Sequence, residues 1–209
     1  MQIIHQYFPN LTPIQVEQLE ALQPLYEEWN SKINVISRKD IDKLYERHIL
    51  HSMALGILLR FEEDAEILDL GTGGGMPGIP LAILFPDVKF TLIDGTGKKI
   101  KVVQEIIKAI GLKNAHAQQV RAEELKGKKF DFVVSRAVAA LDKLIPWSKR
   151  LLKRKQRHAY PNGLFALKGG NIQAEIDALP FPEYTEIFPL SELFDLDFYE
   201  EKYLVYVQG

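Results

Sequence analysis

The chain has 209 residues, of which 46% are hydrophobic and 26% are charged. This length and composition favour one well-packed globular domain over a disordered chain. The sequence contains no cysteine, which excludes disulfide bonds, zinc sites with thiolate ligands and a thiol nucleophile. The N-terminal segment lacks a secretory signal pattern, and no apolar run approaches the roughly 20 residues that cross a bilayer. We therefore expect a cytoplasmic protein that makes no membrane contact.

The charges are unevenly distributed along the chain. The formal net charge is −2, but residues 171–209 hold nine acidic residues and one base, which leaves 25 basic and 19 acidic residues, or +6, before them. One explanation is a solvated acidic surface on the C-terminal segment. The other is that the rest of the molecule presents a basic face to a polyanion. Net charge alone leaves both open.

Residues 1–62 are expected to form a helical N-terminal extension. Thr12, Pro13 and Gln15 match a helix start with a capping box. The apolar residues that follow recur at helical spacing and predict one helix that runs to about residue 30, with its buried face formed by Leu19, Leu22, Tyr26 and Trp29. Two further helical patterns lie at 41–49 and 53–61.

Residues 63–209 alternate between strand and helix patterns. Strands are predicted at 67–70, 88–93, 116–120, 130–134, 164–167, 184–189 and 203–207, and helices at 79–85, 98–110 and 141–152. This alternation predicts an α/β fold with a doubly wound, mainly parallel seven-stranded sheet that helices cover on both faces. We expect the extension and this core to form one compact unit.

A glycine-rich loop follows the first predicted strand, at residues 71–78. Gly73, Gly75 and Gly78 match the G-x-G-x-x-G pattern of dinucleotide sites, so a nicotinamide-dependent oxidoreductase is one interpretation. Two residues argue against it. The carboxylate of Asp69 would repel a pyrophosphate, and Pro77 has no N–H to donate to phosphate where the next helix starts.

The same loop fits a different nucleoside cofactor better. Gly71, Gly73 and Gly75, in register with Asp69, follow the usual methyltransferase pattern, and the carboxylate suits a ligand with an ammonium and a sulfonium cation. Asp94 ends the next strand, where an acid binds ribose hydroxyls. The loop therefore predicts S-adenosyl-L-methionine as cofactor and a methyltransferase as the enzyme class.

The kind of acceptor atom is narrowed by what the sequence lacks. Methylation of pyrimidine C5 needs a cysteine, and there is none. Methylation of exocyclic amines usually goes with an Asn/Asp-Pro-Pro-aromatic motif after the fourth strand, where this chain has Ser135, Arg136, Ala137 and Val138. A ring nitrogen such as guanine N7 has a free lone pair, so that positioning and exclusion of water suffice.

Several short motifs occur together in a distinctive order: Trp29-Asn30-x-x-x-Asn34, Arg47-His48-Ile49-Leu50, the segment 69–80, Lys98-Lys99, Arg121-x-Glu123, Ser135-Arg136-Ala137 and Leu167-Lys168-Gly169. Over residues 20–170 this combination resembles the glucose-inhibited division protein B family, bacterial class I methyltransferases that modify guanine N7 in 16S ribosomal RNA. The chain departs from the family pattern around Ser52, where His51 and Met53 replace Asp and Leu. It departs again at residues 95–97, which hold two glycines.

The resemblance implies roles for individual residues. Gly71, Gly73 and Met76 would line the cofactor loop together with Asp69, and Asp94 would bind the ribose. Ala122 and Glu123 would flank the adenine. Arg136 would lie near the methionine end of the cofactor or near the target base, and we expect it to serve both cofactor binding and catalysis.

Further candidates come from the predicted sheet edge and its neighbours. Lys168 ends the fifth strand at the same edge as Arg136, which makes it a second catalytic candidate. His48 is a third, although a hydrogen-bonded structural histidine would explain it too. Asn34 either contacts substrate or caps a turn, and Arg121 is expected to contact substrate. His48 and His51 are spaced i, i+3 without a third ligand, so no metal site is expected.

A basic segment at residues 149–158 holds six Lys or Arg residues. It is predicted to be a helix end and loop, where cations also complement the helix dipole. Alternatively, Lys153, Arg154 and Lys155 contact RNA phosphates, with Tyr160 available to stack on an unpaired base.

These observations lead to one main hypothesis and two alternatives. The main hypothesis is methylation of guanine N7 in 16S ribosomal RNA, free or within the small-subunit particle, by a monomer. The first alternative is an RNA-binding ribosome-assembly protein that retains the fold without turnover, and the second is the oxidoreductase.

Overall fold

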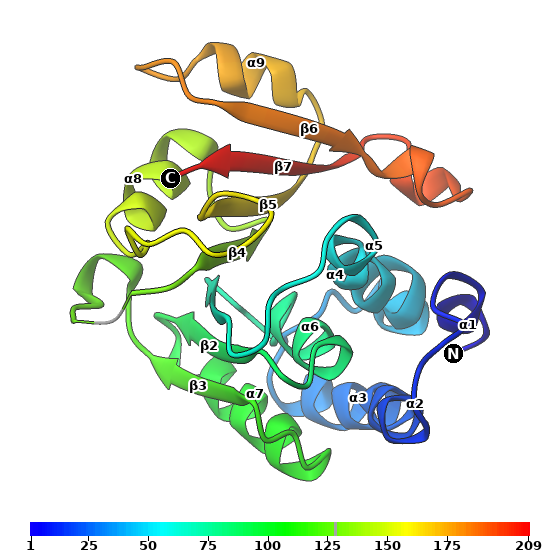
Figure 1. Ribbon diagram of the computed structural model, residues 1–209. Coiled ribbons are helices and arrows are strands. Elements are labelled where there is room, and N and C mark those ends of the chain that lie inside the picture. The colour runs from blue at the N-terminus through cyan, green and yellow to red at the C-terminus, as the bar shows by residue number, and fades with distance from the viewer. Residues whose placement is uncertain (128) are drawn as a thin grey trace.

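Seven strands form a single sheet in the computed structural model, which describes residues 1–127 and 129–209 (Figure 1). The strand order is β3-β2-β1-β4-β5-β7-β6. The bounds are β1 Glu66–Leu70, β2 Lys89–Asp94, β3 Ala115–Gln119, β4 Phe132–Arg136, β5 Gly163–Gly169, β6 Thr185–Pro189 and β7 Lys202–Gln208. Strand β7 runs antiparallel to both of its neighbours, β5 and β6, and the other four strand pairs are parallel. The predicted doubly wound, mainly parallel sheet is confirmed, with strand ends shifted by one or two residues.

The helices are α1 Gln2–Tyr7, α2 Pro13–Glu20, α3 Leu22–Lys32, α4 Leu50–Met53, α5 Leu55–Leu58, α6 Gly78–Leu84, α7 Gly97–Ala109, α8 Leu141–Lys149 and α9 Ile172–Asp177. A π-helical turn spans Tyr45–Ile49, and 3-10 turns span Ile41–Lys43, Ala122–Glu124, Leu190–Glu192 and Asp197–Tyr199. At the start of α2, the Thr12 hydroxyl accepts from the Gln15 N–H at 3.3 Å and the Gln15 side chain accepts from the Thr12 N–H at 2.9 Å. The predicted capping box is confirmed.

The prediction of one continuous helix to residue 30 was wrong. The structure has two helices, which meet at Ala21. Pro24 explains the break, because it has no N–H to donate to the Glu20 carbonyl and its ring clashes with that group. Other helix predictions also differ from the structure. The predicted helices at 41–49 and 53–61 are instead a 3-10 turn, the π-helical turn and the short helices α4 and α5, and α8 ends at Lys149 rather than at residue 152. Helices α1 and α9 were not expected.

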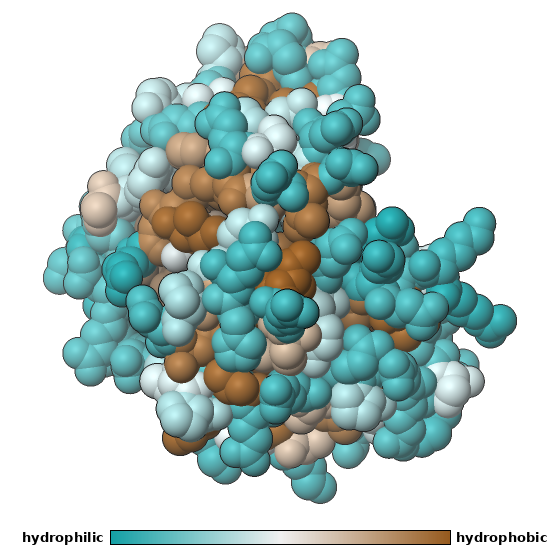
Figure 2. Space-filling view, turned by 90° about the vertical axis from the view of Figure 1, so that its right-hand side faces the viewer, coloured by the Kyte–Doolittle hydropathy of each residue, from teal (hydrophilic) through white to brown (hydrophobic). Residues whose placement is uncertain are grey.

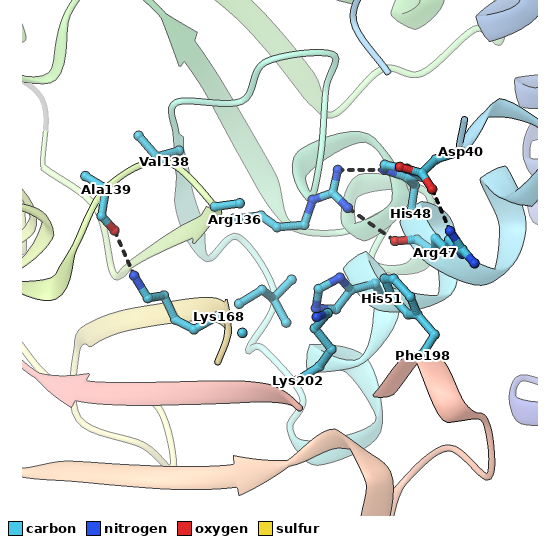
Figure 3. A pocket seen from close by; sticks show the side chains of 13 residues that line it. Asp40, Arg47, His48, His51, Arg136, Val138, Ala139, Lys168, Phe198 and Lys202 are labelled. Carbon is cyan, nitrogen blue, oxygen red and sulfur yellow. Dashed lines mark hydrogen bonds and ion pairs between the residues drawn. The ribbon is translucent and has the colours of Figure 1, made fainter. Parts of the chain in front are cut away.

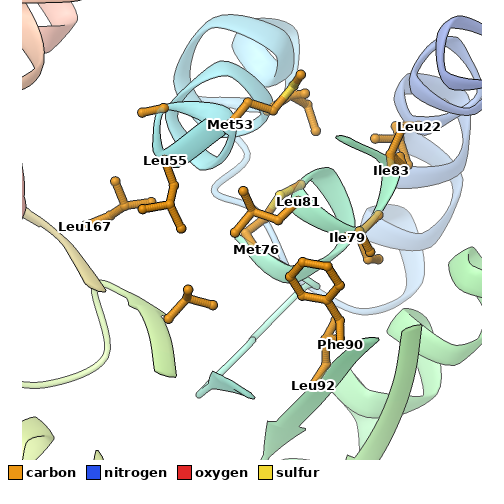
Figure 4. Packing of buried hydrophobic residues seen from close by; sticks show 14 of the residues in the cluster. Leu22, Met53, Leu55, Met76, Ile79, Leu81, Ile83, Phe90, Leu92 and Leu167 are labelled. Atoms are coloured by element: carbon orange, nitrogen blue, oxygen red, sulfur yellow. The ribbon is translucent and has the colours of Figure 1, made fainter. Parts of the chain in front are cut away.

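The two faces of the sheet are covered by different segments. The N-terminal helices, α6 and α7 pack on one face, whereas α8, α9 and the turn at 122–124 pack on the other. Side chains along β1 point alternately to the two faces of the sheet. Ile67 packs in the hydrophobic cluster on the side of the N-terminal helices, and Leu68 packs in the cluster on the side of α8 and α9. Figure 4 shows Leu22 of α3 and Met53 of α4 in one cluster with Phe90 of β2. The extension therefore shares a hydrophobic core with the sheet.

Polar side chains surround the hydrophobic residues on the side of the molecule drawn in Figure 2. The side that faces the viewer in Figure 2 is mostly hydrophilic, with hydrophobic patches between polar side chains. Large exposed apolar side chains include Ile14 on α2 and Phe181 before β6. No helix in the described part of the chain is long and apolar enough to cross a membrane.

Candidate active site

Four predicted functional residues lie at the carboxyl ends of the parallel strands. Asp69 lies one residue before the end of β1, Asp94 ends β2, Arg136 ends β4, and Lys168 lies one residue before the end of β5. Strands β1 and β4 are neighbours from which the sheet continues in opposite directions. Open α/β sheets bind ligands at the carboxyl ends of their strands beside such a switch point.

Asp69 is completely buried beneath the glycine loop. Its Oδ2 atom accepts hydrogen bonds from the Thr72 hydroxyl at 2.5 Å and from the Gly78 N–H at 2.8 Å. Its Oδ1 atom is buried without a hydrogen-bond partner among the described residues. Burial, only partly offset by these hydrogen bonds, raises the pKa of Asp69 to about 7. A cation or a hydrogen-bond donor at Oδ1 would satisfy this carboxylate.

The glycine loop is fastened to the end of β2. The Gly73 N–H donates to Asp94 Oδ2 at 3.0 Å, and the Thr96 N–H donates to Asp94 Oδ1 at 2.7 Å. Gly71 and Gly73 both have positive φ angles, of 73° and 57°, which glycine adopts without the strain that other residues incur. The loop backbone is therefore held close to the Asp94 carboxylate.

A cavity of about 260 Å³ opens beside this loop. It is lined by four of the residues predicted to bind cofactor, which are Gly71, Asp94, Ala122 and Glu123. Arg121 lines it too, so the structure places this predicted substrate contact on the cofactor side. Trp147 of α8 completes the lining and was not foreseen from the sequence. We call this space the smaller cavity.

Met76 is in the loop but its side chain lies in neither cavity. It is buried in the core cluster, where its sulfur accepts a weak hydrogen bond from the Ser52 hydroxyl at 3.6 Å. The predicted contact between Met76 and cofactor could therefore come from its backbone only.

A larger cavity of about 570 Å³ lies on the other side of the loop that follows β4 (Figure 3). Its lining includes all three predicted catalytic residues, Arg136, His48 and Lys168. Other lining side chains were not predicted from the sequence: Asp40, Arg47, Val138, Phe198 and Lys202. His51, noted above as a departure from the family pattern, lines it as well.

Arg136 and His48 form a direct pair. The Arg136 Nη2 atom lies 3.0 Å from His48 Nδ1, and Nη1 lies 3.4 Å from the carbonyl oxygen of Arg47, to which it donates. Burial and the positive charge of Arg136 lower the pKa of His48 to about 4. The imidazole is therefore neutral near pH 7, and its Nδ1 accepts from the guanidinium. His48 lies in the π-helical turn, a rare geometry that is frequent at functional sites.

Lys168 is engaged in structural contacts. Its ammonium donates to the Ala139 carbonyl oxygen at 2.9 Å and to Glu175 Oε1 at 2.8 Å. Its side chain is 11% exposed. The structure thus assigns Lys168 an anchoring contact with the loop after β4.

Aromatic and cationic side chains form the far wall of the larger cavity. The Arg47 guanidinium carbon and the Lys202 ammonium lie over the Phe198 ring, at 5.4 and 5.2 Å from its centre. His51 makes an edge contact with the same ring, and burial lowers the pKa of His51 well below its usual value. Arg47 also pairs with Asp40 at 2.7 Å. Within the described residues, no group of three or more histidine or acidic side chains could hold a metal ion.

The basic segment at residues 149–158 has fewer cations free to contact RNA phosphates than its composition indicates. Lys153 pairs with the buried Asp131 at 3.0 Å and with Glu66 at 2.6 Å. Arg154 and Lys155 are exposed. Tyr160 was expected to be free for stacking, but its ring packs against Phe165 and Tyr206, and its hydroxyl donates to Glu186 at 3.2 Å.

Asn34 is exposed in the loop after α3 and lines neither cavity. Its neighbour Asn30 organises that loop, since Asn30 Oδ1 accepts from the N–H groups of Val35 and Ile36 at 2.8 and 2.9 Å. The predicted substrate contact of Asn34 stays a prediction.

A family model described as rRNA small subunit methyltransferase G matches residues 15–188. The chain belongs to this family. The resemblance found in the sequence motifs is thereby confirmed, as are the predicted enzyme class, a methyltransferase, and its cofactor, S-adenosylmethionine. The oxidoreductase interpretation is set aside.

Similar proteins cover the whole chain. Ribosomal RNA small subunit methyltransferase G of Bacteroides fragilis is 53% identical over 207 residues, which are 99% of each chain. The protein of the same name from Bacteroides thetaiotaomicron is 53% identical over 208 residues, or 100% of each chain to the nearest percent. That from Flavobacterium johnsoniae is 51% identical over 99% of this chain and 97% of its own.

Solved structures agree at the level of fold. A SAM-dependent methyltransferase from Aquifex aeolicus superposes with a TM-score of 0.58 at 14% identity, over 82% of this chain and 98% of its own. A mutant of MtNAS in complex with S-adenosylmethionine superposes with a TM-score of 0.59 at 12% identity, over 93% of this chain and 76% of its own.

Proposed function

We propose that the protein methylates N7 of a guanine in 16S ribosomal RNA. The observation that carries the proposal is the state of the titratable side chains in the larger cavity. His48 is a weak base whose Nδ1 faces Arg136, and Lys168 and Asp40 are both engaged in ion pairs. Such a site favours an acceptor atom with a free lone pair, which needs no general base. Guanine N7 is such an atom.

The residues around the smaller cavity fit S-adenosylmethionine. The Asp94 carboxylate in its lining would accept from ribose hydroxyls. Asp69 lines neither cavity, and its unpartnered Oδ1, buried beneath the glycine loop, would accept from the ammonium of the methionine part. Ala122 and Glu123 would enclose the adenine of the cofactor. When bound, the cofactor supplies a methyl group on a positively charged sulfur.

Arg136 is proposed to orient the target guanine. A guanidinium that is fixed by His48 and by the Arg47 carbonyl has remaining N–H groups to donate to the guanine O6 acceptor. N7 stays unprotonated and open to the methyl group. The chemistry assigned to the protein is therefore positioning and exclusion of water.

The RNA substrate is inferred from the names of the relatives and from the exposed cations. The exposed Arg154 and Lys155, and the half-buried Lys202 at the larger cavity, would contact phosphates. We infer that the protein acts in the cytoplasm, where its ribosomal RNA substrate is found. We also infer that it is a monomer, because few large apolar side chains are exposed among the described residues.

The test is methylation of small-subunit particles, and separately of free 16S ribosomal RNA, with purified protein and S-adenosylmethionine. Mass mapping of RNA digests should find one added methyl group, on a guanine whose glycosidic bond has become labile, as N7 methylation makes it. Methylation of another atom would refute the N7 assignment. Tight binding of particles without methyl transfer would favour a ribosome-assembly role instead.

A further inference from the structure

One side chain belongs to both cavities. Val138 lines the smaller and the larger cavity and is 40% exposed. It also lies against the cofactor loop, because a Cβ atom added to Gly71 would come within 2.5 and 2.8 Å of the two Val138 methyl groups. If cofactor and acceptor occupy the two cavities as proposed above, the methyl group passes beside this side chain.

The backbone next to Val138 is in an unfavourable conformation. Ala137 has a φ angle of +54°, in the left-handed region that residues with a Cβ atom rarely adopt. Its N–H donates to the Leu167 carbonyl oxygen at 3.4 Å, which is a long hydrogen bond. Such a conformation persists only where surrounding contacts enforce it.

Glu175 of α9 supplies those contacts from one carboxylate oxygen. Oε1 accepts from the Leu141 N–H at 2.8 Å and from the Lys168 ammonium at 2.8 Å. The same ammonium donates to the Ala139 carbonyl oxygen at 2.9 Å (Figure 3). The side chains of Lys168 and Glu175 are only 11% and 22% exposed, so water screens this pair less than a surface pair. Residues 139–141 are thus fastened at both ends to β5 and α9.

We propose that Glu175 is a positioning residue for methyl transfer: through Lys168 and Leu141 it holds the 137–141 loop so that Val138 stays between the two cavities. The inference rests on the proposed function for its catalytic meaning. The contacts that run from α9 through Lys168 to the loop do not depend on which atom of the substrate accepts the methyl group.

The experiment compares Glu175→Gln with Asp177→Asn in the full-length protein. The glutamine side chain keeps an oxygen that can accept from Leu141 but loses the charge that holds Lys168. Asp177→Asn removes one negative charge from the same helix, at an exposed residue whose side chain accepts from Gln173. Kinetics on small-subunit particles, binding of S-adenosylhomocysteine, thermal unfolding and amide hydrogen exchange are measured for each.

For Glu175→Gln we expect kcat to fall about tenfold or more, since displacements near 1 Å in a reacting geometry can cost up to about a hundredfold. KM for particles and the unfolding temperature should stay near the wild-type values. Amide exchange at Ala137 and Leu141, whose N–H groups donate to the Leu167 carbonyl oxygen and to Glu175, should become faster, because the loop opens locally. In a Lys168→Met background, Glu175→Gln should cause little further loss, because the two residues act through one contact. Asp177→Asn should match the wild type throughout.

The outcomes separate the two proposals. If Glu175→Gln matches Asp177→Asn in kcat and in loop exchange, the positioning role is overturned. A lower unfolding temperature with unchanged kcat would also overturn it, because the residue would then serve stability alone. If the wild type transfers no methyl group to particles, the proposed function fails, while the exchange measurement still decides whether Glu175 holds the loop.

Discussion

Asp69 should destabilise the protein that has no cofactor bound, at neutral and alkaline pH. Its side chain is fully buried, Oδ1 has no partner among the described residues, and burial raises the pKa from the ordinary 3.8 to about 7. For an acid whose pKa is raised by folding, the free energy of unfolding is highest below pH 3.8. It falls as the pH rises through about 7, because the charged form is disfavoured in the folded state. The difference of about three units corresponds to about 4 kcal/mol at about 1.36 kcal/mol per unit.

Replacement by asparagine removes the charge and keeps the shape. The amide oxygen of the asparagine can accept from both Thr72 and Gly78, as Oδ2 does now. Its NH₂ group would be buried at the position of Oδ1, which costs about 1–3 kcal/mol without a partner. Subtraction from about 4 kcal/mol predicts that Asp69→Asn is more stable than the wild type at pH 8 by about 1–3 kcal/mol. Affinity for a ligand with an ammonium should fall by about 1.5–3 kcal/mol, because a charge-assisted hydrogen bond is lost.

The assay is urea unfolding of both proteins at pH 5 and pH 8 without cofactor, with calorimetric titration of S-adenosylhomocysteine at pH 8. The wild type should lose stability between the two pH values, and the variant should lose much less. Asp131→Asn is the matched control, since Asp131 is equally buried. Burial would raise the pKa of Asp131, but hydrogen bonds from Glu66 and Lys153 outweigh it and leave that pKa lowered. This variant should therefore be less stable at pH 8. An Asp69→Asn protein that is no more stable than the wild type at pH 8, with unchanged ligand affinity, would refute the reasoning.

Three further variants test the assignment of the cavities. Asp94→Ala should weaken binding of S-adenosylhomocysteine by roughly 1.5–3 kcal/mol in calorimetry, and the urea midpoint should fall as well, because the Gly73 and Thr96 N–H groups lose the carboxylate that accepts from them. Neutralising Arg154 and Lys155 together should flatten the plot of log affinity for particles against log salt by up to about two units; unchanged slope would remove this segment from the RNA surface. Lys202→Met should flatten the same plot by about one unit and leave S-adenosylhomocysteine affinity as it was.

The sheet could be predicted from sequence because its signals are local. Most strands are short apolar runs bounded by turn residues, and β3, which reads AHAQQ, has the weakest pattern of the seven. In a parallel sheet the strands share a direction, so residues that end strands must meet at one edge. The sequence alone therefore predicts that Asp69, Asp94, Arg136 and Lys168 lie near one another.

The parts that were missed depend on contacts between distant segments. Phe198 and Lys202 reach the larger cavity because β7 inserts antiparallel beside β5, where Lys202 pairs with Gly169. No spacing near residue 200 indicates that contact. Pro24 is a different case, since the break between α2 and α3 had a local signal that the apolar spacing of the neighbouring residues outweighed.

The charge counted along a segment of the sequence does not predict which cations are available at the site. The N-terminal part of the chain is basic by count, yet Lys153 is bound to the buried Asp131 and Arg157 lies 3.4 Å from the same carboxylate. The C-terminal segment is acidic by count, yet it places Lys202 at the larger cavity. Attraction for a phosphate depends on whether each cation is already paired within a few ångströms and on the local dielectric, and both are properties of the fold. A variant at Lys202 should consequently affect RNA binding more than one at Lys153, the reverse of what the sequence alone predicts.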